Sequence, residues 1–160
     1  MTVIVRRVKT ALQREYRKAG GILVSEAVAG AEGNLGELSA AGMEQIDLTL
    51  ERVCALTANP SRRPTPEELR QIHAAINEML SFCATVRIEG FAETLHAAAR
   101  LVGALMEADV WLDGSLTPVA NLLRLVRRGA VAPENVGVLI LGLDQCAARV
   151  RSHARTTDPQ

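Results

Sequence analysis

Apolar residues recur every three or four positions through most of this chain, a spacing that places them on one face of an α-helix. The clearest run spans residues 66–83, and its apolar positions are Leu69, Ile72, Ile76, Met79, Leu80 and Cys83. The same spacing returns over residues 90–105, 115–129 and 133–150. We therefore predict four helices in the last hundred residues.

A longer apolar series with nearly heptad spacing precedes them. Its members are Val28, Ala31, Leu35, Leu38, Gly42, Ile46, Leu50, Val53 and Leu56. Three further glycines, Gly30, Gly33 and Gly36, weaken the first half by up to ~1 kcal/mol each relative to alanine. We predict helix over residues 42–56 and also over residues 24–41.

A polar, proline-rich loop at residues 59–64 divides the two regions, because no helix can cross it. Thr65 follows as an N-cap residue, Pro66 suits the first helical position, and Glu68 completes a capping box. The next helix is therefore predicted to begin here.

Two later breaks separate the remaining helices. Residues 113–115 (Asp-Gly-Ser) interrupt the chain, and Ser115 is predicted to cap the helix that follows. That helix ends at residues 127–129, two arginines before a glycine, and Pro133 starts the last one. Because the connections are short, we predict an all-α fold, a four- to five-helix up-down bundle.

Composition agrees with this fold class. The chain has 160 residues, 48% of them apolar and only 2% aromatic, which suits close helix packing in one domain. We divide it into a basic N-terminal arm (1–21), a helical bundle domain (22–151) and a polar C-terminal tail (152–160).

Charge is unevenly distributed, although the formal net charge is zero. Residues 1–18 hold six bases against one acid, and residues 25–57 hold six acids against one base, so their net charges are +5 and −5. The acidic neighbour and the scarcity of aromatics argue against nucleic-acid binding. Arg124, Arg127 and Arg128 form a patch that complements a helix C-terminus, with an anion site as the alternative.

The three cysteines, Cys54, Cys83 and Cys146, lie far apart in apolar stretches, as reduced core cysteines do. The longest apolar run, residues 136–143, is too short to span a bilayer. The N-terminus lacks the order of regions found in a signal peptide. These features predict a cytoplasmic protein with no membrane span.

No nucleotide-binding or zinc-protease motif occurs, so we predict no cofactor, no metal site and no enzymatic activity. His153 lies in the polar tail, and His96 is expected to flank an apolar stripe. His73 shares a helix face with Asn77, four residues later. Each histidine is read as structural or solvated, because catalysis would need an orienting partner.

Residues 75–84 (Ala-Ile-Asn-Glu-Met-Leu-Ser-Phe-Cys-Ala) are followed by a glycine-containing turn at 86–91 and by a helix of apolar and small residues at 92–105. This order resembles the histidine-phosphotransfer (Hpt) domain of chemotaxis-type kinases and phosphorelay proteins. In that family a bundle helix carries a His-x-x-Lys-Gly-Ser-Ala pattern before such a turn. The resemblance implies an Hpt-like bundle.

The same register places Asn77 where the family has its phosphoaccepting histidine, Leu80 at the lysine and Ser81 at the glycine. A carboxamide nitrogen is not nucleophilic, and Leu80 supplies no cation for the transferring group. The resemblance therefore implies a phosphotransfer-like fold kept for binding. His73, one turn earlier, is the alternative acceptor.

Three functions remain open from the sequence. The preferred one is a non-catalytic adaptor for a response-regulator receiver domain or a histidine kinase in bacterial two-component or chemotaxis signalling. Its candidate binding residues are His73, Asn77, Leu80, Ser81 and Ala84. The alternatives are a structural or oligomerisation bundle, with the 28–56 seam pairing two chains, and an enzyme that uses His73 or His96.

Overall fold

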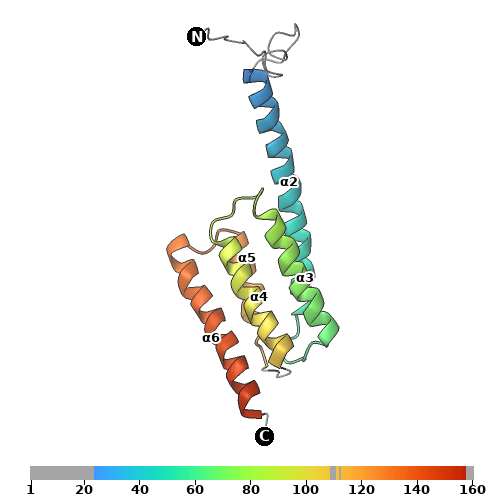
Figure 1. Cartoon of the computed structure of the whole chain (residues 1–160), viewed down its shortest axis with the longest axis vertical. Helices are drawn as coiled ribbons and strands as arrows, with labels where there is room; N and C mark the ends of the chain where they lie inside the picture. The colour runs from blue at the N-terminus through green and yellow to red at the C-terminus, as the bar shows by residue number, and fades with distance from the viewer. Residues whose placement is uncertain (1–23, 109–110, 112, 158–160) are drawn as a thin grey trace, which may run out of the picture. The chain divides into compact units, whose positions relative to one another are not determined.

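The computed structural model describes residues 24–108, 111 and 113–157 of the chain, and it contains only helices and connecting segments there (Figure 1). The helices are α2 (Val24–Leu56), α3 (Pro66–Phe82), α4 (Phe91–Ala108), α5 (Thr117–Arg127) and α6 (Pro133–Thr157). The predicted all-α bundle is confirmed, as are all the predicted helices. The basic arm predicted over residues 1–21 lies outside the described residues.

The chain divides into two units, Met1–Glu37 and Leu38–Gln160. In the first, residues 24–37 are helical, and every side chain described there is exposed. Two large apolar side chains of this helical stretch, Val28 and Leu35, are 49% and 59% exposed. The first half of the near-heptad series therefore forms a helix without burying its apolar face.

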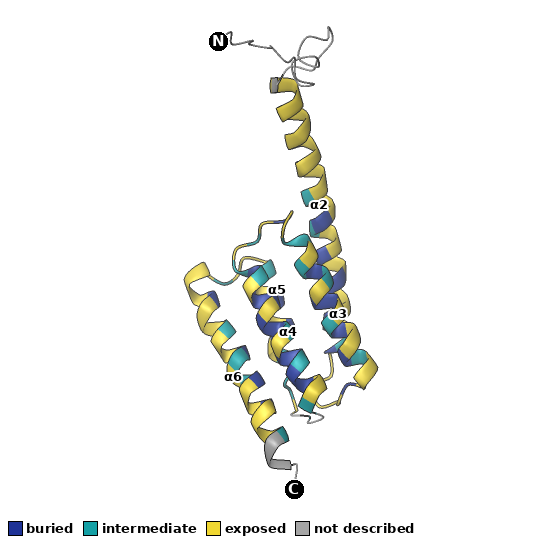
Figure 2. Cartoon of the chain, in the orientation of Figure 1, coloured by how far each residue is buried: buried dark blue, intermediate teal, exposed yellow. Residues whose placement is uncertain are grey.

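The core lies in the second unit and is built around α4, which packs against α3, α5 and α6. Phe91, Leu95 and Leu101 of α4 are fully buried. The C-terminal half of α2 adds Ile46 and Val53, which are also fully buried. Figure 2 shows buried positions concentrated on α3, α4, α5 and this half of α2, whereas α6 is mostly exposed.

The predicted capping box at the start of α3 is confirmed. The Thr65 hydroxyl accepts a hydrogen bond from the Glu68 backbone N–H at 3.2 Å, and the Glu68 carboxylate accepts one from the Thr65 N–H at 2.8 Å. Arg62 adds a 2.7 Å ion pair to the same carboxylate. The Arg62 hydrogen bond, followed by that from the Thr65 backbone, lowers the pKa of Glu68 to about 2.

This pKa makes the contribution of Glu68 to stability depend on pH. A carboxyl whose pKa is lowered on folding stabilises the protein above its unfolded pKa, and the gain is lost as pH falls through the folded value. We expect Glu68→Gln to lower the free energy of unfolding at pH 7, and the difference from wild type to shrink between pH 4.5 and about 2. Urea denaturation across that pH range measures it. A difference that does not change with pH would contradict the assignment.

The predicted cap at Ser115 is wrong. The N-cap of α5 is Leu116, whose side chain cannot accept a hydrogen bond, and Pro118 stands in the first turn of the helix. Leu116 is only 3% exposed. Burial of this side chain fixes where the helix begins. The Ser115 hydroxyl is itself buried without a hydrogen-bond partner among the described residues.

Two glycines allow neighbouring elements to approach closely. Gly90 precedes α4 with φ +71°, and a Cβ built there would lie 2.9 Å from a methyl carbon of Val136 on α6. A Cβ at Gly42 on α2 would lie 2.8 Å from Cγ2 of Val86, in the turn after α3. The α3–α4 connection is therefore packed tightly on two sides.

Candidate functional site

The candidate face runs along α3 and into the turn that follows it. The side chains of His73 and Asn77 are joined on it by a contact of 3.2 Å between Asn77 Nδ2 and His73 Nδ1. Asn77 is exposed, and His73 is half-buried. When the amide donates, Nδ1 of His73 is the acceptor and the ring proton lies on Nε2. The unprotonated nitrogen of His73 is then occupied by Asn77.

The other three candidate residues continue this face. Leu80 is half-buried against the core, and Ser81 and Ala84 are exposed. The Ser81 hydroxyl donates to the backbone carbonyl of Glu78 at 2.6 Å, so its proton is used within the helix. On this face the exposed Asn77 carboxamide therefore lies with the small, exposed Ser81 and Ala84 and with the half-buried His73 and Leu80.

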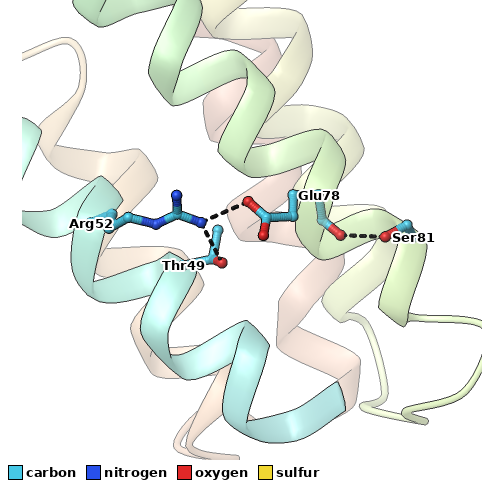
Figure 3. A network of polar contacts seen from close by, with 4 residues as sticks. All are labelled: Thr49, Arg52, Glu78 and Ser81. Atoms are coloured by element: carbon cyan, nitrogen blue, oxygen red, sulfur yellow. Dashed lines mark hydrogen bonds and ion pairs between the residues drawn. The ribbon is translucent and has the colours of Figure 1, made fainter. Parts of the chain in front are cut away.

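An ion pair borders the face on the side of α2 (Figure 3). The Arg52 guanidinium donates to the Glu78 carboxylate at 2.6 Å and to the hydroxyl of Thr49 at 2.9 Å. The side chains of Arg52 and Glu78 are 61% and 41% exposed, so the pair contributes about 0–1 kcal/mol. Arg52 is therefore held by Glu78 at the edge of this face.

A hollow of about 350 Å³ between α2 and α5 contains the predicted arginine patch. Arg127 pairs with Asp47 at 2.7 Å, and Arg124 lies close enough to the thiol of Cys54 to act on its pKa. Burial raises the pKa of that thiol, although Arg124 opposes the shift. Since two of the three arginines have partners within the bundle, the patch mainly ties α5 to α2.

Further hollows lie elsewhere on the described part of the bundle. One of about 110 Å³ is lined by Pro66, Arg70 and Trp111 among others. A larger one of about 360 Å³ lies between α5 and α6 and is almost entirely apolar. No histidine lines any of these three hollows. His96 is exposed on α4.

Among the described residues, no group of His, Cys, Asp and Glu side chains is arranged to hold a metal ion. No helix in that part is long and apolar enough to cross a membrane. Comparison of the chain with protein-family models, with curated proteins and with solved structures finds no match.

The apolar outer surface of α6 was not predicted from the sequence. The spacing over residues 133–150 predicts a single apolar stripe, but Val138 and Leu141 are also apolar and are exposed. The signal was the uninterrupted apolar run over residues 136–143. Such a run places apolar side chains on both sides of a helix, so only one set can face the core.

Proposed function

We propose that the protein is a non-catalytic, Hpt-like adaptor of bacterial two-component or chemotaxis signalling. It works in the cytoplasm, and its α3 face binds a response-regulator receiver domain or a histidine kinase. The observation that carries the proposal is the exposure of Asn77 among small side chains, at the position where the resemblance places the phosphoacceptor.

The chemistry of the face favours binding over phosphoryl transfer. Asn77 offers a donor and an acceptor but no nucleophilic nitrogen. The imidazole of His73 is engaged by Asn77, and Arg52 is engaged by Glu78, so neither of these two described side chains is free to act as base or cation at the acceptor position. Ser81 and Ala84 are small enough to let a partner backbone approach α3. Such a face can still bind a partner protein but cannot accept a phosphoryl group.

A second candidate is a structural or oligomerisation bundle. Leu35 and Leu38, two members of the near-heptad seam, are each 59% exposed, which favours this function because exposed apolar series mark interaction surfaces. Ile46, further along the seam, is fully buried and is unavailable to a partner. Only the first half of the seam supports this alternative.

The adaptor proposal is tested with the receiver domains and histidine kinases encoded near the gene. We expect at least one receiver or kinase to bind the full chain, and Asn77→Arg to weaken binding at least about tenfold, because a bulky charge replaces a carboxamide at the centre of the interface. Gln71→Arg is the matched control, since Gln71 is exposed on another side of α3. Isothermal titration calorimetry gives both dissociation constants.

Phosphotransfer is measured in parallel with radiolabelled phospho-receiver. Binding without label on the adaptor is the expected result. Label that appears on the chain and is lost in His73→Gln would replace the proposal with an active, displaced acceptor. No binding to any receiver or kinase would leave the structural bundle as the function.

A further inference from the structure

Helix α6 carries an exposed stripe opposite its buried face. The side chains it buries are Val136, Leu143, Ala147 and Val150. Spacings of four and three residues align another set along the opposite side. This set, which we call the outer stripe, comprises Glu134, Val138, Leu141, Gln145 and Arg149, all exposed. Val138 and Leu141 are 69% and 56% exposed, so the middle of the outer stripe is apolar and open.

The apolar groove between α5 and α6 borders the outer stripe. Its volume is about 360 Å³, and its lining includes Leu125, Val138, Leu139, Gly142 and Cys146. Val138 therefore belongs to both features. A Cβ built at Gly142 would meet nothing within 4 Å.

A glycine in mid-helix costs about 1 kcal/mol relative to alanine. No close contact within the described part of the chain requires Gly142 to lack a side chain. A close approach by another molecule would make use of the open space above it.

We propose that α6 pairs with α6 of a second copy, antiparallel, about a two-fold axis between Leu141 and Gly142. In such a pair each residue faces the one equally far on the other side of the axis, and every contact occurs twice. Leu141 of one copy then faces Gly142 of the other. At the ends of the contact, Glu134 faces Arg149.

Shape supports this register. Leu141 is 56% exposed, and Gly142 leaves open space at the edge of the apolar groove. When Leu141 of one copy lies over Gly142 of the other, its side chain packs between Val138 and Cys146 of that other copy. This is the way a knob packs into a hole in a coiled coil. The two-fold symmetry fills both grooves at once.

Charge supports the same register. Glu134 and Arg149 are both exposed, and neither forms an ion pair within the described part of the chain. Antiparallel pairing about the proposed axis brings opposite charges together at both ends. A parallel pair in register would instead place Glu134 beside Glu134, and like charges would oppose it.

The first test removes the apolar knob. We expect the full chain to dimerise in sedimentation equilibrium, and Leu141→Asp to weaken dimerisation at least about tenfold, equivalent to about 1.4 kcal/mol or more. Leu48→Asp is the matched control, because Leu48 is 50% exposed on α2, away from the outer stripe. Circular dichroism checks that both variants keep their helices. A wild type that stays monomeric, or a dimer that survives Leu141→Asp, overturns the proposal.

The second test fixes the register. Glu134→Arg and Arg149→Glu each create like-charge contacts at both ends, so each is expected to weaken the dimer about tenfold. The double variant restores opposite charges and should return within about threefold of wild type. Failure of the double variant to recover would exclude this antiparallel register.

This inference does not depend on the adaptor function. Asn77→Arg lies on α3 and is expected to leave dimerisation unchanged, whereas Leu141→Asp leaves the α3 face intact. A dimer lost in Leu38→Asp but retained in Leu141→Asp would show that the copies pair through α2, and would overturn the proposed α6 contact.

Discussion

Gly90→Ala is expected to lower the free energy of unfolding by roughly 2–5 kcal/mol. Two costs add at this position. A left-handed backbone disfavours any residue with a Cβ by about 1–2 kcal/mol, and an overpacked core loses about 1–3 kcal/mol more. The second cost arises because the new methyl would lie 2.9 Å from Val136 on α6. Urea denaturation with linear extrapolation measures the loss.

Gly114 serves as a control that measures the backbone cost without the packing cost. Its φ is +75°, close to that of Gly90, but a Cβ there would meet nothing within 4 Å. Gly114→Ala should therefore lose only the backbone cost, about 1–2 kcal/mol. Equal losses of unfolding free energy in Gly90→Ala and Gly114→Ala would show that Val136 moves aside without strain.

Phe91→Ala is expected to cost about 3–5 kcal/mol of stability, because it leaves a cavity in the core. Phe91 is fully buried at the start of α4, the helix that α3, α5 and α6 all contact. The chain has only one other phenylalanine, Phe82, which is half-buried at the end of α3. Thermal and urea unfolding of both alanine variants should show a clearly smaller loss for Phe82. A loss at Phe82 as large as that at Phe91 would contradict the central place given to α4.

Helix boundaries could be predicted where they depend only on contacts between residues close together in the sequence. The capping box of Thr65 and Glu68 needs only residues three apart, and the structure contains it. At Ser115 the same reasoning failed because burial of Leu116 decides where α5 begins. A preference of about 1 kcal/mol at a cap yields to the burial of a leucine side chain, worth about 1.5–3 kcal/mol.

Apolar periodicity predicted the helices but not which faces are covered. The near-heptad series continues from Val28 to Leu56 in steps of three or four residues. In the structure Leu35 and Leu38 are exposed, whereas Ile46 and Val53 are buried. Spacing aligns side chains on one side of a helix, and whether that side is buried depends on which other elements lie against it.

The candidate face was predictable in part. Four-residue spacing places His73 beside Asn77, and the contact between them is present. The pair of Arg52 and Glu78 that borders the face was not predictable, because the two residues lie 26 positions apart. That contact depends on how α2 and α3 pack, which no local pattern encodes.

Because Cys54 is buried, the rate of its chemical modification can report local opening of the bundle. Its side chain lies at the hollow between α2 and α5 and is only 8% exposed, and burial raises the pKa of its thiol, so an alkylating reagent finds little thiolate to attack. Burial also raises the pKa of the Cys83 thiol, but Cys83 and Cys146 are only half-buried and should be modified earlier because the reagent reaches them more easily. The rate at which the third thiol is modified then reports how often α2 and α5 separate, which gives a local opening free energy for the native protein without any attached label.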